Sequence, residues 1–378
     1  MRKVLLVTDS FLPLVDGVTK FSCDIMNSLS RDFRFRLVAP DYGLRLNDYN
    51  GVGIRYFKTN KLIKINAGSV YHPSVPNIFS MLREVRKSDV VFVQSLPYLG
   101  AYGIIAAKLA KRPVAMYFHQ IGWEQLGHVV PGAAWFKNLV RLFALVQMRF
   151  LCNMCDVIMV PSEEIRDILN NAGFGARKAV VRLGVNTKRF VPAKDRAAAK
   201  KKLGIPKNGM VIGYCGRMSE EKDVITLIKA FLKVSKERKN LQLLLVGDGQ
   251  RLEKYTLRNR NIRITGFVSD VVPYYDAMDI FVMPSLTETT GLTTVEAMSS
   301  GIPIVTTPVG IALKGIVEGH NGLIYGRSDV NGLARQLERL IGSRMLRERI
   351  AKNGREYVLK EYSWDRTARD VKRVLEGL

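Results

Sequence analysis

The sequence predicts an α/β protein with two doubly wound domains. Short apolar runs of strand length alternate along the chain with helical patterns, which is the order typical of parallel sheets covered by helices. The length of 378 residues exceeds one typical domain and suits two of roughly 190 residues each. Glycine-containing loops follow several of the runs, where open α/β sheets bind their ligands. Both domains are therefore expected to be Rossmann-like.

The strand-like runs occur in both halves of the chain. In the first half they lie at residues 4–7, 36–39, 90–93, 114–117 and 157–160. In the second half they lie at residues 211–216, 243–246, 280–283 and 304–306. We predict a first domain at residues 1–187, a second at 188–362, and a helix at 363–378 that crosses back onto the first domain.

Composition and charge limit the classes of function. The net charge is +24, and both halves are basic, so nucleic acid, anionic lipid and phosphorylated small molecules are all candidate partners. Four scattered cysteines make no disulfide framework and indicate a reduced, cytoplasmic protein. No uncharged apolar run is long enough for a spanning helix, so any membrane contact is expected at the surface.

The stretch at residues 283–301 has the features of a phosphate site. An apolar run ends at Pro284, and a helical pattern begins shortly after Gly291. A helix start offers free N–H groups and the positive end of the helix dipole, which favour an anion. Hydroxyl groups surround this start, at Thr287, Thr289, Thr290 and Thr293. The loop is therefore predicted to seat a phosphate.

Charged side chains of both signs accompany this site. Arg217 and Lys222 lie on the loop that leaves the strand at 211–216 and suit a diphosphate. Glu288 lies in the phosphate loop and Glu296 lies one to two turns into the helix. Carboxylates beside an anion site suit a ligand that carries both hydroxyls and phosphates, such as a nucleotide sugar.

These residues also carry a family resemblance. Glu288-x7-Glu296, with Gly291-Leu292 between the two glutamates and Gly-Ile-Pro at 301–303 after them, resembles the signature of the retaining GT-B-fold glycosyltransferases of family four. Gly216-Arg217, followed by Lys222, also has the spacing of that family's diphosphate site. The resemblance implies two domains that face each other across a cleft, with the nucleotide sugar bound mainly by the second half and the acceptor by the first.

The resemblance also implies roles for individual residues. Arg217 and Lys222 would bind the diphosphate, Glu288 the sugar hydroxyls and Glu296 the ribose. Three further implied contacts are Gly17 with a phosphate, His119 with the transferred sugar and Val268 with the base. Three residues at the helix start complete the donor site: Gly291, Leu292 and Thr293. The chain departs from the family pattern at Asp16, before Gly17, and at Gln94, where related enzymes often have a histidine.

The expected reaction moves a hexose, mannose or glucose in our ordering, from a GDP- or UDP-linked donor to an acceptor hydroxyl with retention at the anomeric carbon. The favoured acceptor is a membrane lipid or a polyprenol-linked glycan. No aspartate-rich metal motif is evident, so the sequence predicts neither a metal nor a cofactor, and protein cations take the place of a metal at the diphosphate.

Two segments are candidates for contact with a membrane. Residues 135–150 form an apolar helical pattern edged with Lys137, Arg141 and Arg149, which can lie on anionic lipid at the inner face of a membrane. A second stretch is interpreted as loop-rich and is enriched in basic residues: Arg45, Arg55, Lys58, Lys61 and Lys64. The alternative interpretation is a core helix and a solvated loop.

Other functions stay open at this point. A related enzyme could use a soluble acceptor, or could epimerise or phosphorolyse a nucleotide sugar. A protein that is not an enzyme could use its charge to bind nucleic acid or a membrane surface. Nucleic acid is not expected, because the basic helical segment at 194–202 lacks aromatic or base-reading partners.

Overall fold

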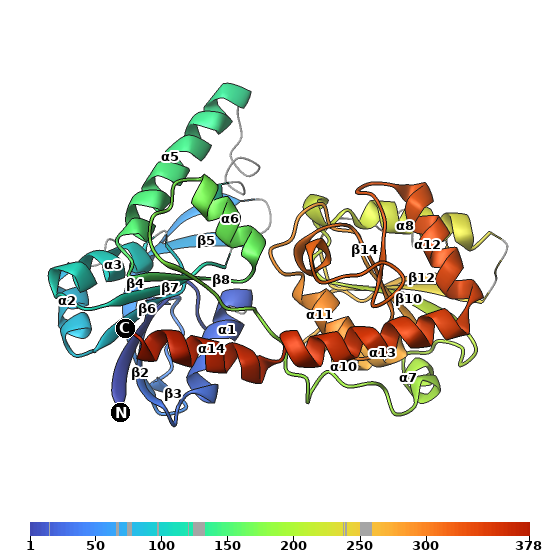
Figure 1. The fold of residues 1–378 in the computed structure, drawn as a ribbon, viewed down its shortest axis with the longest axis horizontal. Helices are drawn as coiled ribbons and strands as arrows, with labels where there is room; N and C mark the ends of the chain where they lie inside the picture. Colours follow the sequence, from blue (N-terminus) through green and yellow to red (C-terminus); the bar gives the residue numbers. More distant parts are fainter. Residues whose placement is uncertain are drawn as a thin grey trace. The chain divides into compact units, whose positions relative to one another are not determined.

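The computed structural model forms two compact units, Met1–Arg182 with Thr367–Leu378 (unit 1) and Leu183–Arg366 (unit 2) (Figure 1). Side chains at 59–73 are not described. The structure describes the backbone of residues 1–14, 16–65, 68–73, 78–96, 98–119, 121–123, 133–236, 238, 240–249 and 259–378.

The sheet of unit 1 is mostly parallel, and its strands run in the order β3-β4-β2-β1-β6-β7-β8-β9. The central strands β6, β7 and β8 are fully buried apolar runs, as expected for strands covered on both faces. The strand bounds are β1 Arg2–Val7, β2 Phe33–Asp41, β3 Asp48–Tyr49, β4 Val52–Ile65, β5 Gly68–Pro73, β6 Val90–Val93, β7 Val114–Tyr117, β8 Val157–Val160 and β9 Lys178–Val180.

The interpretation of the basic stretch as loop-rich is wrong for most of its length. Arg55, Lys58, Lys61 and Lys64 all lie in β4, which pairs in parallel with β2 and antiparallel with β5. Arg45 alone lies outside a strand, where it pairs with Asp41. Arg55 and Lys58 are both exposed, and because they are three positions apart along the strand, their side chains point to opposite faces. These charges therefore occupy exposed positions of a strand and not of a loop.

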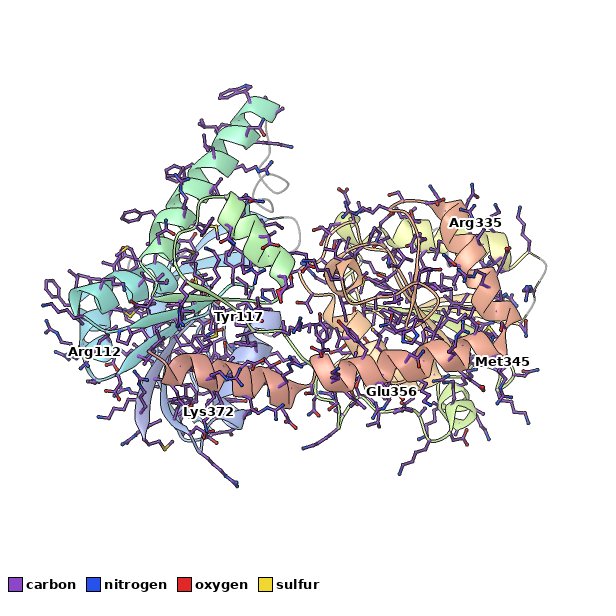
Figure 2. The ribbon with its side chains drawn as sticks, in the orientation of Figure 1. Arg112, Tyr117, Arg335, Met345, Glu356 and Lys372 are labelled. Atoms are coloured by element: carbon purple, nitrogen blue, oxygen red, sulfur yellow. The ribbon has the colours of Figure 1, made fainter. Side chains whose placement is uncertain are left out.

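Helices cover the sheet of unit 1. Their bounds are α1 Gly17–Ser28, α2 Ile78–Arg86, α3 Leu99–Leu109, α5 Ala134–Asn153, α6 Glu163–Asn171 and α14 Trp364–Glu376. Gly103 lets α3 approach β1 closely, because a Cβ there would lie 3.3 Å from the Val7 side chain. In Figure 2, Tyr117 lies inside this unit, where its hydroxyl donates to the Val181 carbonyl at 2.8 Å.

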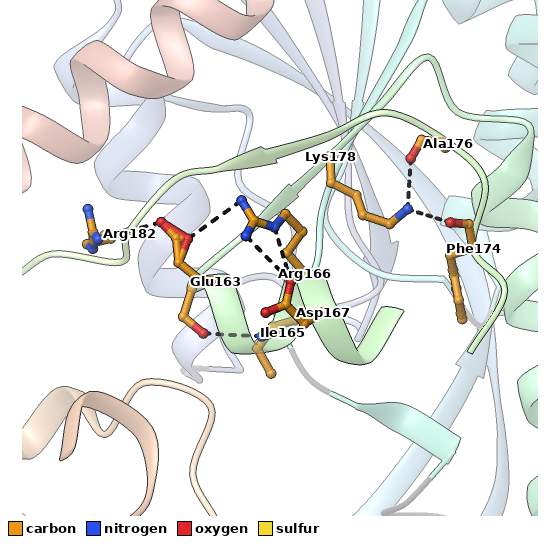
Figure 3. A network of polar contacts seen from close by, with 9 residues as sticks. Glu163, Ile165, Arg166, Asp167, Phe174, Ala176, Lys178 and Arg182 are labelled. Carbon is orange, nitrogen blue, oxygen red and sulfur yellow. Dashed lines mark hydrogen bonds and ion pairs between the residues drawn. The ribbon is translucent and has the colours of Figure 1, made fainter. Parts of the chain in front are cut away.

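Helix α6 is held at its start by a side-chain cap and by ion pairs. Ser162 caps it by accepting from the Ile165 N–H at 3.3 Å, and Glu163 in its first turn lies 3.9 Å from Arg182. Figure 3 shows Arg166 between Glu163 and Asp167, and the Lys178 ammonium donating to the carbonyls of Phe174 and Ala176. These contacts fix the chain around β9.

The sheet of unit 2 is wholly parallel, in the order β12-β11-β10-β13-β14-β15. Its strands are β10 Met210–Cys215, β11 Leu241–Val246, β12 Ile262–Ile264, β13 Ile280–Met283, β14 Ile304–Thr306 and β15 Leu323–Ile324. Its helices are α7 Arg196–Lys202, η1 Glu220–Lys222, α8 Val224–Val234, α10 Val272–Ala277, α11 Leu292–Ser299, η2 Gly310–Leu313, α12 Val330–Gly342 and α13 Arg344–Glu361. The prediction of two doubly wound α/β domains is confirmed.

The carboxy-terminal helix α14 has its first residues in unit 2 and its remainder in unit 1. In unit 2 the Trp364 N–H donates to the Val185 carbonyl at 2.9 Å. In unit 1 Lys372, labelled in Figure 2, contacts Asp32 at 2.5 Å. The predicted ranges 1–187 and 188–362, with the acceptor assigned to the first and the nucleotide sugar to the second, stay a prediction.

We expect Gly247→Ala to destabilise unit 2 by at least about 2 kcal/mol, because the new methyl group would overlap backbone in a strained conformation. Gly247 has φ +133°, and a Cβ there would lie 2.0 Å from the Gly216 carbonyl oxygen. Denaturant unfolding of the purified protein measures the change. Gly342→Ala is the control, because a Cβ there meets nothing within 4 Å. Equal stability of the two variants would contradict the packing described.

Candidate functional site

The loop after β10 presents Arg217 to solvent. Gly216 has φ +147°, and a Cβ there would lie 2.9 Å from the Tyr214 hydroxyl. That hydroxyl donates to the Arg217 carbonyl at 2.6 Å and so holds the backbone of the loop. The Arg217 guanidinium itself is 81% exposed, with Nη2 3.8 Å from Oε1 of Glu221. An exposed guanidinium on a fixed backbone is available to an anionic ligand.

Lys222 and Glu288 are brought together from the loops after β10 and β13. The Lys222 ammonium lies 2.6 Å from Oε1 of Glu288, and the two side chains are only 18% and 15% exposed. Ser285 also donates to Oε1 of Glu288, at 2.9 Å. Both bonds reach the same oxygen, so the carboxylate is oriented by two groups from its own unit. A partly buried pair of this kind holds two opposite charges next to each other without leaving either unpaired.

Helix α11 begins at the end of the loop that carries Glu288. Its N-cap is Gly291, which has φ +77° and ψ +56°, and no side chain within the described part of the chain caps this start. The first N–H groups of a helix have no partner inside the helix, so this start can receive an anion. A Cβ at Gly310 would lie 2.6 Å from the Thr290 carbonyl oxygen, so the segment at η2 packs directly on this loop.

The other donor-site candidates of unit 2 differ in exposure. Glu296 is buried, and the Tyr275 hydroxyl donates to its Oε2 at 3.0 Å. Leu292 packs against the core of unit 2, and the Thr293 carbonyl accepts from Tyr275 at 3.3 Å. Val268 is half-buried against the same core. The roles expected for these residues and for Gly291 stay predictions.

Phe267 was missed by the sequence analysis. It directly precedes Val268, is 80% exposed, and follows Gly266, which has φ +71°. An aromatic ring held in solvent on the loop after β12 is an available stacking surface. The sequence signal that could have found it is an aromatic residue directly after a glycine in the loop that follows a strand.

In unit 1, Gly17 begins α1 directly after the Asp16 cap. Asp16 accepts from the Thr19 N–H and from the Ser10 hydroxyl, both at 2.7 Å. The departure from the family pattern at Asp16 therefore has a local function in starting this helix. Gly17 is not required by the fold of this unit, because its φ lies outside the left-handed region and a Cβ there would meet nothing within 4 Å. The open space beside its backbone is compatible with close approach of a ligand.

His119 lies at the carboxyl end of β7 among aromatic rings. Its ring centroid is 4.6 Å from that of Tyr117 and 5.0 Å from that of Phe21. Desolvation lowers the pKa of His119 to about 3, and the Asp16 carboxylate opposes this shift. The imidazole is therefore neutral at physiological pH and acts through its hydrogen-bonding atoms.

Gln94 is a second residue whose place at the site the sequence did not predict. It directly follows β6, is 1% exposed, and its Oε1 lies 3.0 Å from Nε2 of His119. In this amide orientation Nε2 of the ring is protonated and donates a hydrogen bond to Oε1 of Gln94, and Nδ1 carries the lone pair. The amide nitrogen of Gln94 is buried without a hydrogen-bond partner in the described part of the structure. It is an unused donor beside His119, at the strand end where a related histidine is often found.

Comparisons with known proteins extend the description of the two sites. Residues 15–189 match the family model Glycosyltransferase Family 4, and residues 195–357 match Glycosyl transferases group 1. The Anabaena protein HepE, solved in complex with UDP, has the same fold, with a TM-score of 0.79 over 100% of both chains at 19% identity.

Two curated relatives act on saccharides. A GDP-mannose-dependent monoacylated alpha-(1-6)-phosphatidylinositol monomannoside mannosyltransferase of Corynebacterium glutamicum is 26% identical over 397 aligned positions, 100% of this chain and 98% of the relative. The capsular polysaccharide biosynthesis glycosyltransferase CapM of Staphylococcus aureus is 26% identical over 306, 76% of this chain and 78% of the relative.

The two α/β sheets, one mostly parallel and one wholly parallel, have the fold of GT-B enzymes. The family matches, one for each half, make the identification more specific. The chain belongs to glycosyltransferase family four, the glycosyl transferases group 1. It is a hexosyltransferase that takes its sugar from a nucleotide sugar. The expectations of a GT-B fold and of a glycosyltransferase are confirmed.

We expect Gln94→Glu to raise the pKa of His119 by at least about one unit, because a carboxylate next to the imidazole favours its charged form. An NMR titration of the histidine ring signals measures this pKa, with the His119 signal assigned by its loss in His119→Asn. Gln147→Glu, on an exposed site of the same unit, is the control and should leave the signal unchanged. An unaltered His119 pKa in folded Gln94→Glu would contradict the contact.

Proposed function

We propose that the enzyme transfers a hexose, mannose or glucose, from a GDP- or UDP-linked donor to a hydroxyl of a membrane lipid or a polyprenol-linked glycan, with retention at the anomeric carbon. The observation that carries the donor half of this proposal is the Lys222–Glu288 pair beside the start of α11. A cation from the loop after β10 thereby lies next to a carboxylate from the loop after β13, and that second loop leads into the free N–H groups of α11.

This arrangement suits the chemistry of a departing nucleoside diphosphate. Breaking the bond to the sugar places negative charge on the diphosphate, and preorganised cations and N–H groups stabilise such charge. We assign this task to Arg217, Lys222 and the start of α11 at Gly291, Leu292 and Thr293. No protein nucleophile is assigned; the proposed path has the departing phosphate accept the proton of the acceptor hydroxyl.

The carboxylates recognise the neutral parts of the donor in this proposal. Glu288 accepts hydrogen bonds from the hydroxyls of the sugar through the oxygen that Lys222 and Ser285 leave open. Glu296 binds the ribose, and Val268 contacts the base. Because the Glu296 carboxylate is buried and already accepts from Tyr275, ribose binding there requires its second oxygen or a rearranged Tyr275.

Two residues of unit 1 are also assigned to the donor in this proposal. The backbone at Gly17 approaches a phosphate, in keeping with the open space beside it. His119 hydrogen-bonds the transferred sugar as a neutral imidazole, since its pKa of about 3 excludes a charged ring near neutral pH. The family resemblance supports both assignments.

A membrane-linked acceptor is supported by the charge and by one relative. The net charge of +24 favours an anionic surface. The corynebacterial relative bears the name of a phosphatidylinositol monomannoside mannosyltransferase. No helix in the described ranges combines the length and the apolarity that a bilayer crossing needs. We therefore propose a peripheral location at the cytoplasmic face of a membrane, where the acceptor is presented.

A panel of nucleotide sugars tests the proposal. Thermal stabilisation of the purified enzyme by GDP-mannose, UDP-glucose and their relatives identifies the donor, and labelled donor is then offered membrane lipid extracts and soluble glycans in parallel. Label transferred to a lipid-extractable product supports the proposal. Label transferred only to soluble glycans would contradict the proposed acceptor class. Free nucleotide released without any acceptor would contradict the proposed transfer reaction.

We expect Glu288→Gln to lower the rate of transfer by about a hundredfold, because the neutral amide no longer accepts strongly from the sugar hydroxyls. Nucleoside diphosphate affinity should be unchanged or higher, since Lys222 is no longer neutralised. Steady-state kinetics and calorimetry measure the two effects. Glu348→Gln removes an exposed carboxylate of the same unit and serves as the control. Full activity of Glu288→Gln would refute the assigned role.

Lys222→Met should weaken nucleoside diphosphate binding on the order of tenfold to a hundredfold, because it removes a charge-assisted hydrogen bond to the diphosphate. Calorimetric titration with GDP and UDP measures this. Lys229→Met removes an exposed lysine from the neighbouring helix α8 and should leave binding intact. If both variants bind like the wild type, Lys222 does not contact the diphosphate.

A further inference from the structure

Helix α5 has one face that packs on unit 1 and another that does not. Its buried residues are Ala144, Leu151 and Cys152. Met148 lies on the same side, since a Cβ at Gly122 would meet its sulfur at 3.4 Å. In Figure 1 the first half of α5 extends away from the sheet of unit 1, and in Figure 2 its side chains stand clear of the ribbon there. Core packing therefore accounts for only one side of this helix.

The outward face of α5 is a continuous apolar stripe. Seven large apolar side chains on it are between 39% and 70% exposed: Trp135, Phe136, Leu139, Leu142, Phe143, Val146 and Phe150. Five of them, at positions 135, 139, 142, 146 and 150, recur every three or four residues and so share one face of the helix. Exposed apolar residues normally occur singly, and a contiguous set of this size marks a surface that something covers.

The charge of α5 indicates what covers it. The helix contains three basic residues, Lys137, Arg141 and Arg149, and no acidic residue. By the helical period, Lys137 and Arg141 lie on the side of the helix opposite to the apolar stripe, so they do not interrupt it. An anionic surface matches an apolar face on a helix without acidic residues, in a half of the chain that is itself net basic. Trp135 and Phe136 at the start of the helix add aromatic rings of the type that favours a lipid interface.

We infer that the outward face of α5 docks unit 1 onto an anionic lipid bilayer, with the apolar stripe in the interfacial layer and the net positive charge of unit 1 attracted by the headgroups. The helix lies along the surface in this arrangement, since three charges and its short apolar length prevent it from spanning. This inference deepens the proposed function by naming the surface through which the enzyme meets a membrane-linked acceptor.

Vesicle binding by the full chain tests the inference. Wild-type protein should co-sediment with vesicles that contain phosphatidylglycerol at least tenfold more strongly than with pure phosphatidylcholine vesicles, and added salt should weaken this binding. Brominated acyl chains should quench tryptophan fluorescence, and the quenching should be much smaller in Trp135→Phe. Equal binding to the two vesicle types, or quenching that persists in Trp135→Phe, would overturn the inference.

A double substitution isolates the apolar stripe. Leu142→Glu with Phe143→Glu should lower binding to phosphatidylglycerol vesicles at least tenfold, because two carboxylates replace exposed apolar side chains and repel the headgroups. Leu109→Glu is the matched control, since Leu109 is 65% exposed on α3 of the same unit. Undiminished binding by the double variant would overturn the inference. So would a wild-type dimer, seen by sedimentation velocity, that the double substitution dissociates.

Donor binding separates this inference from the proposed function. Stabilisation by the nucleotide sugar should be the same in the wild type and in the double variant, because no residue of α5 is assigned to the donor. Transfer to a detergent-solubilised acceptor should also persist in the double variant, whereas transfer to an acceptor within vesicles should fall at least tenfold. A wild type that fails to bind any nucleotide sugar but still binds vesicles would contradict the proposed function alone. Equal transfer to vesicle acceptor by both proteins would contradict the docking helix alone.

Discussion

The ion pair between Lys222 and Glu288 depends on the parallel order of the sheet in unit 2. β10 and β13 are neighbours that run in the same direction, so the loops that follow them emerge at one edge. A lysine and a glutamate that are 66 positions apart thereby come within 2.6 Å, with little exposure to water. Each charge offsets the desolvation of the other, so the site keeps both without a ligand. A diphosphate that binds Lys222 has to compete with Glu288 for the ammonium, which links nucleotide binding to the freedom of the carboxylate.

The two units carry different kinds of polar groups at the carboxyl ends of their strands. Unit 2 concentrates formal charge, with Arg217 exposed and Lys222 partly buried. Unit 1 holds a neutral histidine against a buried amide, Gln94, and keeps its nearby carboxylate, Asp16, occupied with the start of α1. In the proposed function, the charge of unit 2 suits an anionic diphosphate, and the neutral groups of unit 1 suit an uncharged sugar. The fit is chemical and does not require any particular sugar.

Basic charge has more than one function along this chain. On β4, Arg55 and Lys58 occupy exposed strand positions and form part of an ordinary surface. On α5, the basic residues accompany an apolar stripe that the rest of unit 1 leaves exposed. After β10, Arg217 is exposed, and Lys222 pairs with Glu288 in the loop that leads to a helix start able to receive an anion. A net charge of +24 is thus the sum of surfaces with different functions, and only their placement separates them.

The sequence alone determined the two doubly wound domains, most strand positions and the loops that hold Arg217, Lys222 and Glu288. Apolar periodicity, glycine after a strand and local capping are all short-range signals. Tertiary structure decided the rest: β4 as a strand, Gln94 beside His119, Glu296 buried against Tyr275, and the outward face of α5. Each of these features depends on which segments pack together. Burial lowers the pKa of His119, and packing on unit 1 covers one side of α5 while the other side stays exposed. Contacts between residues far apart in the chain leave no local pattern from which a sequence could reveal them.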